Sequence, residues 1–319
     1  MSEAAPRPEL QPALAGAEIE AARRRIADIA IRTPLVRAQG ADVRLKLECL
    51  QPYGSYKIRG ATNVVRARIE AGETVEAVVS ASAGNFGQAV AAAARALGLP
   101  CLIHVPDVAA RVKVESLKRL GAEVREHPFA GWWEIMQTRE TGLEGGTFFH
   151  PVCEREVVAG AAVIGDEIAE DFPEVETVFI PIGGGGLACG VAQGVKLARP
   201  DCRIVAVETE VSTPLKAAFE AGRPVTVERR PSFIDGMGST GVLEPMWPLL
   251  QRWIDEVVVV SLAEVEDAIR KLAREQHVVT EGAGAAAYAA ALANARPNAV
   301  AIVSGGNIDA GVLADILKG

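Results

Sequence analysis

Residues 177–190 read TVFIPIGGGGLACG, an apolar run that ends in four consecutive glycines and continues into small residues. The run predicts a buried strand, and the glycines predict a tight turn into a helix that begins near Leu187. Similar runs rich in β-branched residues, each followed by a helical pattern, occur at 202–208, 255–261 and 299–306. Strands that are apolar along their whole length are typical of a parallel sheet covered by helices on both faces. This part of the sequence therefore predicts an α/β fold.

The same alternation of short β-rich runs and longer helical patterns begins near residue 43. It predicts two lobes, each with three layers, in which a parallel sheet lies between helices. We assign residues 1–76 and 153–319 to a large domain and the inserted segment 77–152 to a small domain. No repeat, low-complexity tract or long linker separates these segments. The lobes are therefore expected to be interleaved in the sequence and not tethered.

Composition argues against several classes of protein. The 319 residues are 49% hydrophobic and 23% charged, which is enough to bury a large core around a cleft. The formal net charge is -8, and the basic residues are scattered among acidic ones, so no face is suited to nucleic acid. No apolar run reaches the ~18 residues of a membrane span, and the N-terminus lacks a secretory pattern. We therefore expect a cytoplasmic protein with no nucleic-acid or membrane partner.

The four glycines form the first of four loops that lie where a predicted strand gives way to a helix. Open α/β sheets bind their ligands at this edge. Consecutive glycines let backbone N–H groups converge on an anion, and the following helix N-terminus adds a favourable dipole. The spacing matches neither the GxGxxG dinucleotide pattern nor a P-loop. A phosphate group fits this glycine loop, although a tight turn without a ligand would have the same composition; its members are Gly183, Gly184, Gly185 and Gly186.

The second loop lies in SASAGNFGQAV (80–90), where small and polar residues open an alanine-rich helical pattern. Free N–H groups at a helix start suit a carboxylate, and an ordinary N-cap explains the pattern equally well. The residues concerned are called the 82–85 loop: Ser82, Ala83, Gly84 and Asn85.

The remaining two loops contain a lysine and a serine. GSYKIRGATN (54–63) places Lys57 directly after Tyr56 at the opening of a helix, where an isolated lysine is normally a solvated charge. In IVSGGNID (302–309), Ser304 ends an apolar strand and two glycines open a turn. Neither residue identifies a site by itself.

The four motifs together are far more specific than any one of them. GSYKIRGATN, SAGN, GGGGL and SGGN occur in the order and at the separations of the threonine dehydratase and serine racemase family, which the chain resembles from about residue 20 onward. The resemblance is closest to the short catabolic threonine dehydratases. It implies the type II fold of pyridoxal-phosphate enzymes, which is similar to the tryptophan synthase β chain. It also implies pyridoxal 5'-phosphate as cofactor, a small amino-acid substrate, and a homodimer or homotetramer.

The resemblance further implies roles for the residues of the four loops. Lys57 would hold the cofactor as a Schiff base and act as the catalytic general base. Tyr56 would lie against the cofactor ring, Asn85 would bond the ring hydroxyl, and Ser304 would face the pyridine nitrogen. Leu187 and the glycine loop would bind the phosphate. The 82–85 loop would bind the substrate carboxylate.

These roles predict a dehydratase (ammonia-lyase) that converts a β-hydroxy amino acid such as L-threonine or L-serine to a 2-oxo acid and ammonia. A neutral Ser304 cannot protonate the pyridine nitrogen, which favours prompt loss of the β-hydroxyl over transamination. The racemases that the sequence resembles carry a second serine at the position of Ala83, and alanine has no transferable proton. Elimination is therefore favoured, and amino-acid racemisation is the alternative.

Departures from the family pattern leave the substrate open. Phe86 stands where the family often has His, and residues 160–163 read GAAV where it commonly has Gly-Gln-Gly-Thr. A bulky or aryl β-hydroxy amino acid of the phenylserine type is therefore a further alternative. A β-replacement synthase fits the motifs less well. A non-catalytic binding protein is also less favoured, because Lys57, Asn85 and Ser304 are all present.

No metal site is expected. The five cysteines form no CxxC pair and the four histidines are dispersed, which argues against zinc. Some family members bind a divalent cation through a Glu at a strand end and an Asp six residues later, and here Glu208 matches but Pro214 takes the second position. Because proline has no side-chain ligand, Glu208 is interpreted as a solvated strand end.

Overall fold

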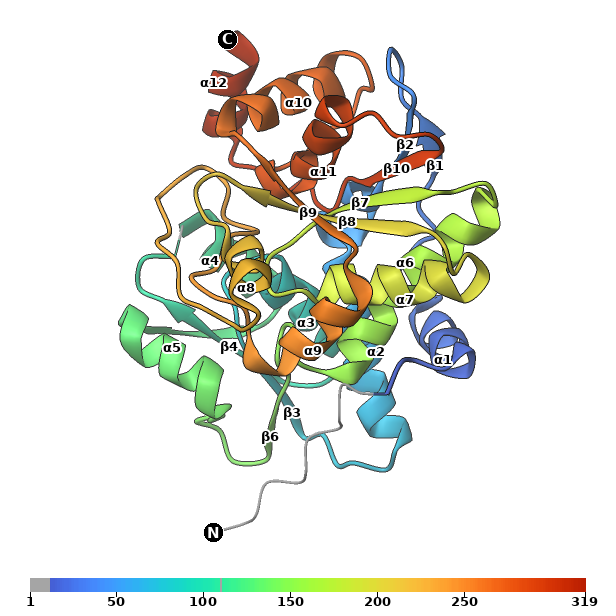
Figure 1. Ribbon diagram of the computed structural model, residues 1–319. Helices are drawn as coiled ribbons and strands as arrows, with labels where there is room; N and C mark the ends of the chain where they lie inside the picture. Colours follow the sequence, from blue (N-terminus) through green and yellow to red (C-terminus); the bar gives the residue numbers. More distant parts are fainter. Residues whose placement is uncertain (1–11, 110) are drawn as a thin grey trace.

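The computed structural model describes residues 12–109 and 111–319, and within them the strands form one sheet of six strands and one of four (Figure 1). The strands pair in parallel, except that β1 runs antiparallel to β2 at one edge. The α/β class with parallel sheets, predicted from the alternation of apolar runs and helical patterns, is confirmed.

The larger sheet contains the strands predicted around the glycine loop. Strands β7 and β10 in its middle are buried at every residue, because helices cover both faces. In β7, Val178 and Ile180 join one apolar core and Phe179 joins the other, as the two-residue period of a strand requires. In order across the sheet, the strands are β1 (Leu35–Arg37), β2 (Val43–Lys46), β10 (Ala299–Ile302), β7 (Thr177–Pro181), β8 (Arg203–Thr209) and β9 (Glu256–Val260).

Helices lie on both faces of this sheet (Figure 1). One layer contains α1 (Gly16–Ile26), α2 (Lys57–Glu70), α6 (Arg155–Asp171), α7 (Gly186–Ala198) and α9 (Trp247–Trp253). The other contains α10 (Leu262–Arg274), α11 (Gly282–Ala293) and α12 (Ala310–Lys318). Helix α6 packs against both α2 and α7. It therefore sets the distance between the first turns of α2 and α7, which carry Lys57 and the end of the glycine loop.

The smaller sheet comes from one continuous part of the chain. Its strands, in order, are β5 (Glu123–His127), β4 (Cys101–Pro106), β3 (Ala77–Ala81) and β6 (Gly146–Phe148), with helices α3 (Asn85–Ala96), α4 (Arg111–Arg119) and α5 (Phe129–Thr138). One apolar core includes Val78 and Ile103 of this sheet together with Ile164 of α6. The domain boundaries expected from the sequence, at 76/77 and 152/153, stay a prediction, and residues 1–11 of the large domain lie outside the described residues.

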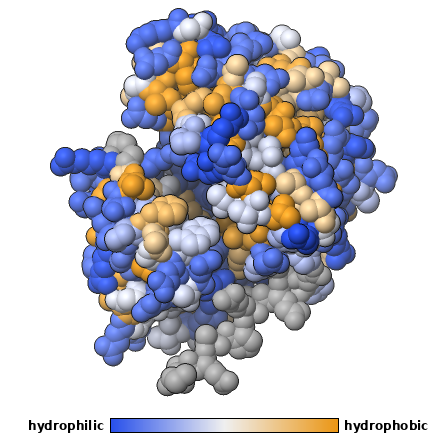
Figure 2. Space-filling model, turned by 60° about the vertical axis from the view of Figure 1, so that its left-hand side comes forward, coloured by the Kyte–Doolittle hydropathy of each residue, from blue (hydrophilic) through white to orange (hydrophobic). Residues whose placement is uncertain are grey.

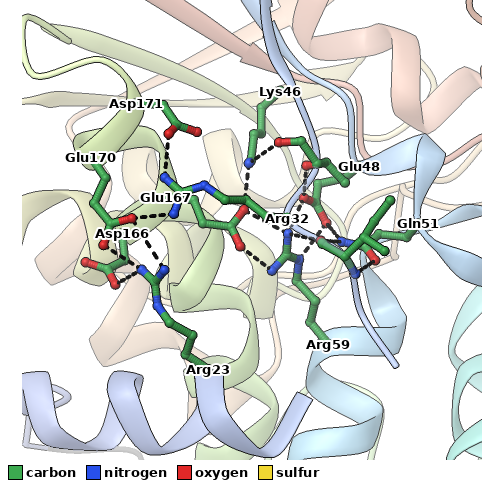
Figure 3. A network of polar contacts seen from close by, with 12 residues as sticks. Arg23, Arg32, Lys46, Glu48, Gln51, Arg59, Asp166, Glu167, Glu170 and Asp171 are labelled. Atoms are coloured by element: carbon green, nitrogen blue, oxygen red, sulfur yellow. Dashed lines mark hydrogen bonds and ion pairs between the residues drawn. The ribbon is translucent and has the colours of Figure 1, made fainter. Parts of the chain in front are cut away.

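A group of buried charges joins α2, α6 and the start of the larger sheet (Figure 3). The Arg59 guanidinium donates to the Glu48 and Glu167 carboxylates at 2.8 Å, and Lys46 Nζ donates to Glu167 at 2.6 Å. Each of these four side chains is at most 4% exposed. Burial by itself would raise the pKa of Glu48, but the Arg59 guanidinium holds it below its ordinary value. The network is balanced in charge and fixes α2 immediately after Lys57.

The face of the molecule drawn in Figure 2 is hollowed between a smaller and a larger mass, and hydrophilic and hydrophobic side chains both border the hollow. Among residues 12–109 and 111–319, no helix combines the length and the apolar character that crossing a membrane requires.

Candidate active site

Lys57 is the first residue of α2, and the backbone before it is held by the C-terminal part of the chain. The Tyr56 N–H donates to the Ser304 carbonyl at 3.1 Å. Lys57 Nζ lies 3.5 Å from the Pro151 carbonyl oxygen, 5.1 Å from the centre of the Tyr56 ring and 5.8 Å from that of Phe86. The side chain is half-buried among these groups. It is therefore not the solvated surface lysine that its position in the sequence alone would suggest.

Lys57 lines a pocket to which three of the four predicted loops contribute residues. Ser304, the glycine loop and Tyr56 all line it. Several other lining residues were not predicted as site residues, and these are Val152, Pro181, Ala188, Gly236, Met237 and Ala283. Leu187, which was predicted, completes the lining. The structure thus brings the lysine, the glycines and the serine together although they lie far apart in the sequence.

The glycine loop connects β7, which ends at Pro181, to α7, which begins at Gly186. Gly185 has a φ of 96°, a left-handed conformation that an L side chain rarely adopts. The first backbone N–H groups of a helix lack partners within the helix, and its dipole makes this end positive. The loop and the start of α7 are therefore suited to an anion beside Lys57.

Ser304 lies two residues after β10, which ends at Ile302, and is only 4% exposed. Its hydroxyl lies 3.4 Å from the Ala283 carbonyl oxygen, a long contact that leaves the hydroxyl available to a closer partner in the pocket. A hydroxyl can donate or accept a hydrogen bond without carrying charge.

The 82–85 loop leads into α3, and its residues are half-buried. They are not among the residues that line the pocket around Lys57. Phe86, the next residue, is buried and approaches Lys57, so the start of α3 is close to the lysine. Asn85 Nδ2 donates to Glu281 Oε1 at 2.7 Å, and Asn85 Oδ1 accepts from Asn307 Nδ2 at 2.8 Å.

Glu281 and Asn307 are the polar residues near the site that the sequence analysis missed. Asn307 belongs to the SGGN motif, so its place beside Ser304 and two glycines was an available signal. Glu281 had no comparable signal, because a glutamate at the start of an alanine-rich helix is ordinarily a favourable charge at the helix N-terminus. In the structure Glu281 is 5% exposed and contacts Asn85.

The pKa of Glu281 gives a first prediction. Burial raises it from 4.5 to about 7, against the opposing effects of the Asn85 hydrogen bond and the Lys113 and Lys57 charges. The carboxyl ionises at lower pH in the unfolded chain than in the folded protein. Its ionisation therefore stabilises the unfolded state more and more as the pH rises from 4.5 to about 7. As the pH rises from 4.5 to about 7, the wild-type protein should lose about 3 kcal/mol of unfolding free energy through this carboxyl. The Glu281→Gln variant lacks the titrating group, so its unfolding free energy should rise relative to wild type by this amount.

Urea unfolding of the two cofactor-free proteins at both ends of that pH window measures this change. The other titrating groups are common to both proteins and cancel in the difference. A difference in unfolding free energy that does not depend on pH would contradict the raised pKa.

Glu208 corrects one interpretation from the sequence. It was expected to be a solvated strand end, but it is only 2% exposed. Its carboxylate accepts hydrogen bonds from the N–H groups of Leu215 at 2.7 Å and Lys216 at 2.9 Å, in the first turn of α8 (Pro214–Ala221). The buried carboxylate satisfies helix donors that would otherwise lack partners. The expectation that no metal binds here stays a prediction.

Comparison with known proteins assigns the family. The family model described as "Pyridoxal-phosphate dependent enzyme" matches residues 26–305, most of the chain. The chain belongs to this family. Its members use pyridoxal phosphate, so this is its cofactor, and the recognition made from the four motifs is confirmed.

Relatives and solved structures agree with this assignment. The L-threonine ammonia-lyase of Thermotoga maritima is 37% identical over 312 residues, which cover 94% of this chain and 77% of that protein. Maize serine racemase has a similar structure, with a TM-score of 0.87, 30% identity, and coverage of 96% of this chain and 98% of that one. The T.th. threonine deaminase has a TM-score of 0.84, 32% identity, and coverage of 93% of this chain and 99% of that one. The type II fold expected for this pyridoxal-phosphate enzyme is confirmed.

Proposed function

We propose that this pyridoxal-phosphate enzyme is an ammonia-lyase that converts a β-hydroxy amino acid, such as L-threonine or L-serine, to a 2-oxo acid and ammonia. The observation that carries the proposal is the pocket in which Lys57, the glycine loop and Ser304 meet. The names of the threonine ammonia-lyase and threonine deaminase relatives support the same reaction class.

The pocket residues fit the cofactor. Lys57 would supply the amine that binds the cofactor aldehyde, and the glycine loop with Leu187 would hold the phosphate at the start of α7. Tyr56, whose ring centre lies 5.1 Å from Lys57 Nζ, would pack against the cofactor ring. Ser304 would meet the pyridine nitrogen and Asn85 the ring hydroxyl. When bound, the cofactor provides an electron sink for the pair left at the substrate Cα.

The chain's own groups would carry out the proton transfers and the orientation. The amine of Lys57, once released by the incoming substrate, would take the Cα proton as a general base. The 82–85 loop would hold the substrate carboxylate against the N-terminus of α3. Ser304 is a neutral partner and would not protonate the pyridine nitrogen, so the cofactor would withdraw electrons only moderately. Loss of the β-hydroxyl would then compete well with transamination.

The proposal extends to the organisation of the protein. We infer a large domain formed by residues 1–76 and 153–319 and a small domain formed by 77–152, which contains all the strands of the smaller sheet. We also infer a homodimer or homotetramer in the cytoplasm, in line with the family resemblance. Sedimentation of the purified protein would measure its oligomeric state.

The test is a substrate panel. The cofactor-loaded protein is incubated with L-threonine, L-serine, their D-forms and β-phenylserine, and the release of 2-oxo acid is followed. Release from L-threonine or L-serine supports the proposal, and preference for β-phenylserine would assign a bulkier substrate. Cofactor binding without release of 2-oxo acid from any of them would overturn the lyase assignment in favour of racemisation or β-replacement.

Ala83 gives a prediction that separates elimination from racemisation. It is half-buried in the 82–85 loop and has no transferable proton. Ala83→Ser would place a hydroxyl beside the substrate, so the rate of D-serine formation relative to pyruvate formation from L-serine should rise about tenfold or more. Chiral chromatography and a 2-oxo acid assay measure this ratio.

Ala96→Ser provides the matched control, because Ala96 is exposed at the C-terminal end of α3, the helix that follows the 82–85 loop. This control should leave the ratio unchanged. A wild-type enzyme that already formed D-serine as fast as pyruvate would contradict the role given to Ala83.

A further inference from the structure

The amide of Asn85 lies between two side chains that the proposed chemistry has not used. We propose that Glu281 and Asn307 are positioning residues that fix this amide so that its one remaining N–H donates to the ring hydroxyl of the cofactor. This inference rests on the proposed placement of the cofactor at Lys57. It adds to that placement a supporting pair of residues with a defined task.

Two hydrogen bonds fix the orientation of the Asn85 amide. A primary amide has two N–H donors and one carbonyl oxygen. The Asn85 oxygen accepts from Asn307 Nδ2 at 2.8 Å, and one Asn85 N–H donates to Glu281 Oε1 at 2.7 Å. The reverse orientation would point an Asn85 N–H at Asn307 Nδ2, which is itself a donor, and the bond between the two amides would be lost. One N–H is therefore left, and it can only donate.

Asn307 is itself fixed. Its second Nδ2 hydrogen bond goes to the Tyr53 carbonyl oxygen at 2.9 Å. Both N–H groups of Asn307 are thus used as donors, one to the segment just before Lys57 and one to the start of α3. The backbone beside it is tied in the same way, because the Gly306 N–H donates to the Gly54 carbonyl at 2.8 Å. Asn307 therefore connects the lysine segment to Asn85.

Glu281 is held equally well. Its N–H donates to the Gly305 carbonyl at 3.0 Å. A Cβ on Gly305 would lie 2.4 Å from Glu281 Oε1, so glycine at this position leaves the room that the carboxyl occupies. The charged groups that face the carboxyl are Lys57 from α2 and Lys113 from α4, and Lys113 also pairs with Asp235. The carboxyl is therefore placed by the backbone next to Ser304 and directed at Asn85.

The task of Glu281 is to accept a hydrogen bond, which distinguishes it from a group that acts through its charge. A carboxylate and the carbonyl oxygen of a protonated carboxyl both accept from an N–H. A glutamine at position 281 would retain this acceptor, whereas an alanine would remove it. The two substitutions therefore separate positioning from charge.

The experiment compares Glu281→Ala, Glu281→Gln and Asn307→Ala with wild type in two readouts. One is the dissociation constant of pyridoxal phosphate from a titration of the cofactor-free protein. The other is the visible absorption band of the bound cofactor. Loss of one hydrogen bond that orients a cofactor ligand should raise the dissociation constant about tenfold in Glu281→Ala and Asn307→Ala and change the band. Glu281→Gln should stay within about twofold of wild type in affinity.

Equal cofactor affinity and spectrum in wild type and Glu281→Ala would overturn the inference. So would a Glu281→Gln variant as impaired as Glu281→Ala, because that result would assign the effect to charge. Thermal unfolding of each cofactor-free variant checks the fold. If Glu281→Ala does not fold, Asn307→Ala decides, because it leaves the buried carboxyl in place. A wild-type protein without a band that depends on Lys57 would overturn the proposed function together with this inference.

Discussion

Replacement of Lys57 by alanine is expected to lower 2-oxo acid release by ~10³-fold or more, because the same amine would hold the cofactor and take the Cα proton. The fold should be retained. Lys57 has no part in the buried network of Arg59, and its polar contact with the Pro151 carbonyl is 3.5 Å long. Activity should therefore be lost without a matching loss of unfolding free energy.

Reduction with borohydride followed by peptide mass analysis provides a measurement that does not depend on turnover. The cofactor should be trapped on the peptide that contains Lys57 in wild type and should not be trapped in the Lys57→Ala variant. Lys196→Ala is the matched control, since Lys196 pairs with Asp255 at 2.8 Å and does not line the pocket. Normal trapping and normal release by the Lys57→Ala variant would rule out the proposed role of this lysine.

The largest loss of stability is expected from Arg59→Met. Arg59 is 1% exposed and binds the Glu48 and Glu167 carboxylates, both of which are buried. Methionine approximates the length of the side chain but leaves these two carboxylates with Lys46 as the remaining cation of the network. Removing one partner from a buried ion pair typically costs about 3–5 kcal/mol of unfolding free energy. Urea unfolding of the cofactor-free protein would measure this loss.

The matched control lies in the outer part of the same region (Figure 3). Arg32 pairs with Glu170 and Asp171, but its side chain is 43% exposed. Water solvates these charges whether or not the pair forms, so Arg32→Ala should cost about 0–1 kcal/mol. Equal losses from Arg59→Met and Arg32→Ala would show that burial of the inner network does not determine its contribution.

The sequence predicted the glycine loop and Ser304 because each is a local pattern shortly after a strand. The glycine loop follows β7, and Ser304 follows β10. Neighbouring parallel strands end at the same edge of a sheet, so these two loops had to meet once the fold was known. The class of fold and the meeting of these two loops in the pocket therefore follow from local patterns together with one rule of topology.

The contacts of Asn85 could not be predicted in this way. Its partners Glu281 and Asn307 are 196 and 222 residues away in the sequence, and no periodicity relates such positions. The same limit applies to Glu208, whose carboxylate turned out to accept hydrogen bonds from the first turn of α8. Side chains whose function depends on a distant partner become visible only in three dimensions.

The order of the strands determines when each sheet can form during synthesis on the ribosome. All strands of the smaller sheet lie between Ala77 and Phe148, so that sheet can pair while the rest of the chain is still being made. In the larger sheet, Val43 pairs with Ala299, so β2 cannot pair with β10 until the chain has been synthesised through Ile302. Ser304 and Asn307 emerge later still. The nascent chain would therefore be able to bind its cofactor only after β10 has entered the middle of the larger sheet and these two residues have been made.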